Sequence, residues 1–234
     1  NREEIDSKLI KEAEKNNIKI YKGFTVVNTF GYKRINKISI MQLSKDGQKV
    51  VGSKISIACD CLGISGGWTP AVHLFTQSGG KLKFRDEDQV FIPDIYPSDQ
   101  ISIGSCNGDF TLDEIISSIP NKLKEFLNVK KTDYENLEIY SAFNKSKRNI
   151  WLLPSDKVIG KTKSFVDYQN DATAKDIKLA LREGFRSIEH VKRYTTLGMA
   201  TDQGKTSNLN GLQLVSEIEN KVVPAVGHTT FRPP

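Results

Sequence analysis

The sequence predicts an α/β region followed by a small all-α domain. Three observations lead to this fold class. First, a helical pattern precedes short alternating segments over residues 2–58. Second, a glycine-rich loop joins a strand pattern to a capped helix over 100–127. Third, three helical patterns follow residue 172. We therefore expect an α/β region over 1–128, a connector over 129–164 and a helical domain over 165–234.

The first part of the chain is expected to form one helix and then strands. Apolar residues at helical spacing, among them Ile5, Leu9 and Ala13, predict a helix over 2–16. A helix, a strand and a meander are typical of the second half of a dinucleotide-binding subdomain. Alternating segments bounded by glycines and by the Asp46-Gly47 turn signal predict strands at 18–21, 25–29, 35–43 and 49–58.

A nearly continuous apolar run covers residues 55–64 and predicts a strand buried on both faces. The glycines after Ser65 break this strand, and Pro70 is expected to begin a short helix. We interpret Trp68 and His73, which lie in this stretch, as packing groups rather than catalysts.

A second glycine-rich stretch, Gly104-Ser-Cys-Asn-Gly108, follows a predicted strand at 100–103 and precedes a helix. Thr111 and Glu114 have the spacing of a capping box, and Pro120 is expected to kink or end that helix. A loop of this kind directs amide groups at an anion or a polar ligand edge. Many α/β turns share the pattern without binding anything, so the loop alone leaves both interpretations open.

The connector over 129–164 is rich in Lys and Asn, with an apolar island at 151–154 that we expect to pack on its neighbours. Three helices are expected after it. The first begins after the cap signal at Thr173 and ends at Gly184, the second begins at Ser187, and the third covers about 209–218. We interpret Asp167 as a solvated turn or cap residue.

The chain is basic, with a formal net charge of +6 and a pI of about 9.1. Basic residues alternate with acidic ones and form no run of five or more, which argues against nucleic-acid binding. The charge fits an ordinary lysine-rich surface, an acidic partner or a phosphorylated cofactor. No segment approaches the roughly 20 apolar residues of a membrane span.

The cysteines, Cys59, Cys61 and Cys106, are expected to be buried free thiols of a reducing compartment. Since the start also lacks the pattern of a signal peptide, we expect a cytoplasmic protein. The three histidines show no metal-ligand spacing, so we expect no metal. A first residue other than Met and an end without a polar tail lead us to expect a piece of a longer polypeptide.

Three motifs give the chain a family resemblance that spans most of its length. They resemble the α subunit of heterotetrameric sarcosine oxidase. The motifs are SGGWTPAVHLF at 65–75 with Gln77, Gly79 and Gly80 behind it, GSCNG at 104–108, and the stretch 165–208.

The resemblance implies an enzyme subunit made of several parts. Such α subunits have an N-terminal part similar to pyridine-nucleotide-disulfide oxidoreductases that holds NAD, then a small helical domain, then a folate-binding part. Sarcosine is oxidised at FAD on the β subunit, FMN lies at the α/β interface, and γ and δ subunits complete the heterotetramer. The implied reaction yields glycine and hydrogen peroxide and passes a one-carbon unit to tetrahydrofolate or releases formaldehyde.

The resemblance also implies cofactor-binding residues, although we expect no catalytic residue in this chain. Gly104, Asn107 and Gly108 would form one wall of the nucleotide site. The Gly-x-Gly-x-x-Gly turns that hold the pyrophosphate are not in this sequence, so NAD is implied for the whole subunit rather than for this piece. The loop at Lys205, Thr206 and Ser207, together with Arg193, would face the FMN phosphate; the alternative is a solvated lysine in a capped turn.

The helical domain is also similar to cluster-binding domains of related amine dehydrogenases. Those domains hold a two-iron, two-sulfur cluster with four cysteines. Val166, Tyr168, Asp202 and Ser207 occupy the matching positions, and none is a thiolate, so we expect no cluster.

Two alternatives remain open at this point. The chain could belong to another flavin-dependent amine or proline dehydrogenase, which the missing cysteines make less favourable. It could also be a cofactor-free interaction module with a vestigial nucleotide site. Bound NAD or flavin would separate the enzyme subunits from the module.

Overall fold

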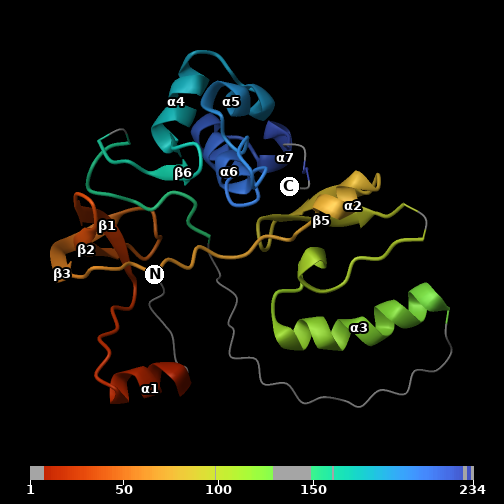
Figure 1. Cartoon of the computed structure of the whole chain (residues 1–234), viewed down its shortest axis with the longest axis horizontal. Coiled ribbons are helices and arrows are strands. Elements are labelled where there is room, and N and C mark those ends of the chain that lie inside the picture. Colours follow the sequence, from red (N-terminus) through yellow and green to blue (C-terminus); the bar gives the residue numbers. More distant parts are fainter. Residues whose placement is uncertain (1–7, 98, 129–148, 160, 229–230, 233–234) are drawn as a thin grey trace. The chain divides into compact units, whose positions relative to one another are not determined.

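The structure is a computed structural model that describes residues 8–97, 99–128, 149–159, 161–228 and 231–232 (Figure 1). It divides into two compact units. Unit 1 comprises Asn1–Gly66 and Ile150–Ser164, and unit 2 comprises Gly67–Asn149 and Phe165–Pro234. The predicted domain boundaries remain predictions, and residues 129–148 of the predicted connector lie outside the described part of the chain.

Unit 1 contains a three-stranded antiparallel sheet in the order β1-β2-β3. The strands are β1 (Phe24–Gly31), β2 (Ile35–Leu43) and β3 (Val50–Ala58), which confirms three of the predicted strands to within two residues. β2 lies in the centre and is the most buried, with Ile38, Ile40 and Leu43 in the core. Apolar β-branched residues suit such a pleated, half-buried surface.

Two other predictions for unit 1 are wrong. Residues 18–21 form no strand, and Ile18 is exposed. The apolar run 55–64 is not one buried strand, because β3 ends at Ala58 and residues 59–64 are mostly exposed. The β2–β3 ladder ends at the pair of Lys37 with Ala58. Because β2 begins only two residues before Lys37, β3 has no pairing partner beyond Ala58. The predicted N-terminal helix is present as α1 (Lys8–Lys15), and its residues 2–7 lie outside the described part.

Unit 2 begins with a short helix and a hairpin. The helix α2 (His73–Gln77) follows Pro70 as expected, and β4 (Lys81–Arg85) pairs antiparallel with β5 (Val90–Ile95). This hairpin was not predicted from the sequence, although hydrophobic residues flank an acidic turn there. His73 is buried, as a packing group should be, but Trp68 is 73% exposed, which contradicts its interpretation as one.

The glycine-rich loop of unit 2 contains the 3-10 helix η1 (Gly104–Asn107), which precedes α3 (Leu112–Leu127). The capping box of Thr111 and Glu114 is confirmed. The strand predicted at 100–103 is absent, because this extended segment has no strand partner among the described residues. Pro120 does not end α3, which continues through it to Leu127.

The rest of unit 2 is the helical region, which confirms the three predicted helices. They are α4 (Ala174–Arg182), α5 (Ile188–Thr195) and α6 (Asn208–Glu219). Their apolar faces meet in a core that excludes water from side chains such as Ile177, Val191 and Val215. The small hairpin of β6 (Phe165–Asp167) and β7 (Ala172–Thr173) and the short helix α7 (Val223–Val226) were not predicted from the sequence.

The cysteines are free thiols, as expected, but they are not buried: Cys61 is exposed, and Cys59 and Cys106 are half-buried. Among the described residues, no helix has the length and apolar character needed to cross a membrane.

Candidate functional site

The predicted nucleotide-site loop is held in a left-handed backbone conformation at both of its glycines. The φ angle is +74° at Gly104 and +84° at Gly108. Side chains rarely adopt this region, so both positions favour glycine. A Cβ at Gly108 would also lie 2.8 Å from Arg85 Nη2 and 2.8 Å from Ile92 Cγ2. Packing against the β4–β5 hairpin therefore already requires glycine at 108.

The amides of this loop mostly close the turn. Gly108 N–H donates to Ser105 O at 3.1 Å, and Asp109 N–H donates to Gly104 O at 3.2 Å. The carbonyl of Gly108 accepts from Arg85 Nη2 at 2.7 Å. These contacts hold the loop in place. They also leave fewer backbone amides free to bind a ligand than the sequence pattern alone predicts.

Asn107 is oriented by an aromatic neighbour. Tyr96 Oη donates to Asn107 Oδ1 at 3.1 Å, and the Tyr96 ring packs edge-on against Phe75 with centroids 5.0 Å apart. Burial raises the pKa of Tyr96, partly opposed by hydrogen bonding with Ser102, so its hydroxyl stays a donor at neutral pH. The Asn107 amide nitrogen has no partner among the described residues and is left to donate to a ligand.

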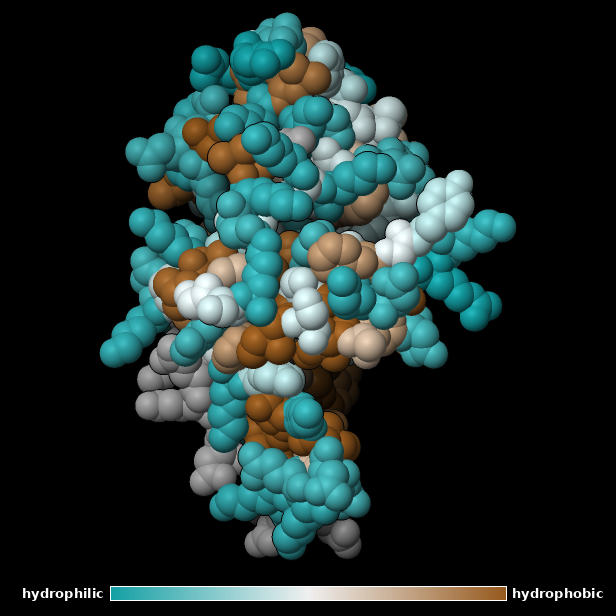
Figure 2. All heavy atoms as spheres, turned by 90° about the vertical axis from the view of Figure 1, so that its left-hand side faces the viewer, coloured by the Kyte–Doolittle hydropathy of each residue, from teal (hydrophilic) through white to brown (hydrophobic). Residues whose placement is uncertain are grey.

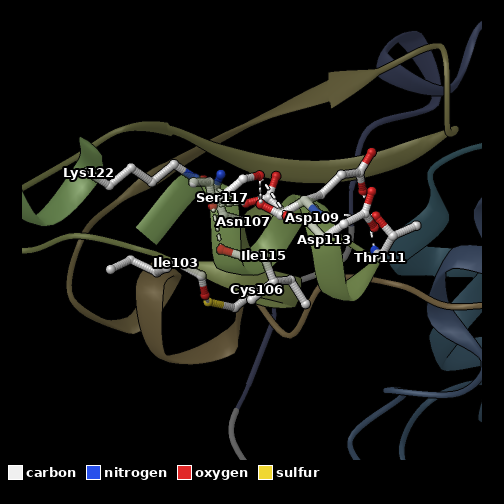
Figure 3. A network of polar contacts seen from close by, with 12 residues as sticks. Ile103, Cys106, Asn107, Asp109, Thr111, Asp113, Ile115, Ser117 and Lys122 are labelled. Atoms are coloured by element: carbon white, nitrogen blue, oxygen red, sulfur yellow. Dashed lines mark hydrogen bonds and ion pairs between the residues drawn. The ribbon is translucent and has the colours of Figure 1, made fainter. Parts of the chain in front are cut away.

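The charge beside this loop is locally balanced. Asp109 Oδ2 accepts from Lys122 Nζ at 3.1 Å and from Ser118 Oγ at 3.3 Å, which joins the loop to α3 (Figure 3). Lys122 is therefore already paired and does not offer its full charge to an anion. A cavity of about 300 Å³ lies between α3 and the segment before the loop, and it is lined by Tyr96, Gln100, Ile101, Ser102, Lys122, Glu125 and Phe126.

The second predicted site, the loop that carries Lys205, is organised by Asp167. This carboxylate is 2% exposed and lies at the end of β6. Its Oδ1 accepts the amides of Gln169 at 2.9 Å and Asn170 at 3.2 Å. Its Oδ2 accepts the amide of Gly198 at 2.7 Å and the hydroxyl of Ser207 at 3.4 Å. Asp167 is thus a buried anchor rather than a solvated turn residue.

Asn208, the first residue of α6, shapes the same loop from within. A Cβ on Gly198 or Gly204 would lie 2.1 or 2.2 Å from Asn208 Oδ1, so both positions require glycine. Both glycines also have positive φ angles. The turn at Asp167 has a local signal in the sequence, since Asp commonly accepts amides two residues on. The contacts of Asp167 and Asn208 across the loop have no such signal.

The hydroxyls of Thr206 and Ser207 are engaged inside the loop. Thr206 Oγ1 donates to Asp202 Oδ2 at 2.8 Å, and the fully buried Ser207 donates to Asp167. Burial alone would raise the pKa of Asp202, but hydrogen bonds from Thr206 and Gly204 and the Lys205 ammonium lower it below its usual value. Asp202 therefore stays ionised and holds the turn.

Lys205 lies close enough to His73 of α2 to affect its titration. Burial, together with the Lys205 ammonium, lowers the pKa of His73, so the imidazole is neutral at pH 7. The His73 ring packs edge-on against Phe231 with centroids 5.5 Å apart, and its Nδ1 is buried without a partner among the described residues. The structure thus relates Lys205 to His73, a pairing that the sequence did not predict.

The remaining predicted positions are less connected. Arg193 is exposed on α5, and no interaction in the described ranges joins it to Lys205 or to the loop at 104–108. Of the four positions that match cluster ligands, Val166 and Ser207 are buried, Asp202 is half-buried and Tyr168 is 70% exposed. No group of three or more His, Cys, Asp or Glu placed to hold a metal ion occurs among the described residues.

Comparison with known proteins connects this arrangement to one family. A family model described as the sarcosine oxidase A3 domain matches residues 161–234, which include the whole helical region. The sarcosine oxidase subunit alpha of Rhizobium meliloti (strain 1021) is 34% identical over 193 residues, which cover 78% of this chain and 18% of the relative. The subunit alpha of Corynebacterium sp. (strain P-1) is 30% identical over 233 residues, 95% of this chain and 24% of the relative.

A solved structure has a similar fold. L-proline dehydrogenase from P. horikoshii matches 97% of this chain and 45% of its own, with a TM-score of 0.57 and 20% identity. This likeness supports the mixed α/β fold with a small helical region. The chain spans less than a quarter of the curated relatives named above. Residues 161–234 belong to the sarcosine oxidase A3 domain family, and the chain as a whole belongs to the sarcosine oxidase subunit alpha family, of which it corresponds to a section.

Proposed function

We propose that this chain acts as a section of the α subunit of a sarcosine oxidase. The enzyme would oxidise sarcosine to glycine, pass the one-carbon unit to tetrahydrofolate or release it as formaldehyde, and reduce oxygen to hydrogen peroxide. The observation that carries this proposal is the match of 95% of the chain to a sarcosine oxidase subunit alpha. The chain's own role is to present cofactor-facing surfaces, and catalysis takes place on the flavin-bearing β subunit.

The proposed α/β region is part of a dinucleotide-binding fold similar to that of pyridine-nucleotide-disulfide oxidoreductases. In it, the loop over 104–108 forms one wall of an NAD site. The left-handed glycines support this role because they bring the backbone close to whatever lies against the loop. The free amide nitrogen of Asn107 supplies a donor for a ribose or phosphate oxygen.

In the helical region, we assign the contact with the FMN phosphate to Lys205. The hydroxyls of Thr206 and Ser207 donate to Asp202 and Asp167, so their role is to hold the loop. Lys205 supplies the positive charge, and a lysine ammonium suits a phosphate as a compact point charge. Arg193 is a second cation of the same proposed interface with the β subunit.

The assembled enzyme provides the test. The full-length α chain is co-purified with its β, γ and δ subunits, and the protein is assayed for sarcosine-dependent peroxide release. Peroxide release is the expected result. A stable complex that turns over proline or another secondary amine, but not sarcosine, would favour a different amine dehydrogenase. A protein without bound NAD or flavin would favour a cofactor-free interaction module.

A Lys205→Ala variant tests the cofactor contact separately. Its expected effect is a lower FMN-to-protein ratio after gel filtration, measured by absorbance, because the phosphate loses a charged partner worth roughly 1.5–3 kcal/mol. The matched control is Lys175→Ala, which removes an exposed lysine from α4. Equal FMN retention in both variants would contradict the assignment of Lys205.

A further inference from the structure

The net positive charge of this chain comes from unit 1. Residues 1–66 and 150–164 contain 15 Lys and Arg against 8 Asp and Glu, a net charge of +7. The rest of the chain contains 19 basic and 20 acidic residues, a net charge of −1. Unit 1 therefore creates a local positive potential that the other unit does not share.

The tip of the β1–β2 hairpin is a short, tightly closed loop. The last pair of the ladder joins Gly31 to Ile35, so residues 32–34 form the whole connection. A Cβ at Gly31 would lie 1.9 Å from Arg34 O, which shows how closely the two ends of the loop approach. Such a loop orders its backbone before any partner arrives, which lowers part of the entropic cost of binding.

The side chains at this tip point into solvent. Tyr32 is 98% exposed, and Lys33 and Arg34 are exposed and make no ion pair with any described residue. At the base of the tip, the Lys37 ammonium lies 4.4 Å from the centroid of the partly exposed Phe30 ring. Tyrosine and arginine, which Tyr32 and Arg34 supply here, are among the residue types enriched at binding hot spots of protein interfaces.

Figure 2 shows mostly hydrophilic side chains on the face it displays, with apolar areas between them. A mixed surface of this kind suits a protein partner, because interfaces combine apolar contacts with a polar rim. Nucleic acid is a less suitable partner, because acidic residues are interspersed among the basic ones and no basic run occurs.

We propose that the hairpin tip formed by Tyr32, Lys33 and Arg34 is a docking site for an acidic protein surface. Arg34 pairs with a carboxylate, Tyr32 packs on the apolar part of the partner, and the net charge of unit 1 steers the approach. The tip belongs to unit 1, whereas the loops at 104–108 and 205–207 belong to unit 2, and the proposal does not depend on the proposed oxidase function.

The first test measures binding of poly-L-glutamate to the full-length protein by isothermal titration calorimetry. Arg34→Ala is expected to raise the dissociation constant about tenfold, as truncation of an interface anchor does, whereas Tyr32→Ala should change it little, because poly-L-glutamate offers no apolar surface to the ring. The control Lys49→Ala removes one exposed positive charge from the other hairpin of the same sheet and should change it less than about twofold. Equal effects of Arg34→Ala and Lys49→Ala would overturn the proposal, because diffuse charge would then explain the binding. Preferential binding of oligothymidylate would overturn it in favour of a nucleic-acid surface.

The second test identifies the occupant in the full-length protein purified with its partner subunits. A photo-cross-linking benzoylphenylalanine replaces Tyr32, and in the control it replaces the exposed Gln48 of the other hairpin. Mass spectrometry should find that the probe at position 32 captures a segment with more Asp and Glu than Lys and Arg, and that the control does not. Capture of a neutral or basic segment, or no capture at all, would overturn the proposal.

Discussion

The buried carboxylate of Asp167 should be the most sensitive single group of the helical region. It is 2% exposed and has no ion-pair partner among the described residues. Its four donors come from two segments, the turn after β6 and the loop before α6. Replacing it with Ala removes the acceptor for all four donors at once.

The size of the effect follows from these contacts. Three of the donors are backbone amides at 2.7–3.2 Å, and each buried donor left unpaired costs about 1–3 kcal/mol. Water entering the space left by the side chain recovers part of this, so Asp167→Ala should lower the local stability by about 3–5 kcal/mol. Asp167→Asn should cost about 1–3 kcal/mol, because one oxygen still accepts while the new amide group opposes the Gly198 N–H.

Native-state hydrogen exchange is the suitable assay, because it reports the opening free energy at Gln169 and Gly198 themselves. Glu183→Gln is the control; this exposed side chain pairs with Arg182 on the surface, and its loss should cost less than about 0.5 kcal/mol. If Asp167→Ala lowered the opening free energy at Gly198 by less than about 1 kcal/mol, the argument for a buried anchor would be refuted.

Two further predictions concern unit 2. Because burial and Lys205 lower the pKa of His73, the unfolded state binds the proton more readily, and stability should fall as pH drops below about 6.5. Melting curves above and below that pH should show this loss of stability in the wild type and a smaller loss in His73→Phe. In an NMR titration, Lys205→Met should raise the pKa of His73. An unchanged pKa of His73 in that variant would contradict the proximity of Lys205 and His73. Gly108→Ala should destabilise unit 2 by about 2–4 kcal/mol in urea unfolding, through backbone strain and the contacts with Arg85. Gly79→Ala, also at a positive φ but with nothing within 4 Å, should cost only about 1–2 kcal/mol, and equal losses would exclude the steric cause.

The sequence predicted those elements whose signals are local. The capping box at Thr111, the apolar face of α4 and the three strands of unit 1 depend on residues a few positions apart, and all are present. The predictions that failed needed a distant partner. The segment 100–103 has the composition of a strand, but no described strand lies beside it, and the apolar run after Ala58 passes beyond the reach of β2.

Among the predicted site residues, too, local features could be predicted from the sequence, and contacts with distant residues could not. The glycines at 104 and 108 could be read from the sequence as a turn, but only the packing against Arg85 and Ile92 explains why Gly108 is required. The hydroxyls of Thr206 and Ser207 looked available for a ligand, and their use by Asp202 and Asp167 is visible only when the loop is folded.

The sequence by itself determined the three main helices of the helical region, the charge of each part of the chain and the family to which the chain belongs. Helix caps, turn glycines and hydrophobic periodicity act over a few residues, so they survive in a linear string. The tertiary structure alone decided that Asp167 would be buried, that Lys205 would lie near His73 and that Tyr32 would be left in solvent. Burial and long-range hydrogen bonds depend on which segments lie next to one another in the folded chain. The protonation state and the hydrogen-bonding capacity of a side chain depend in turn on these neighbours.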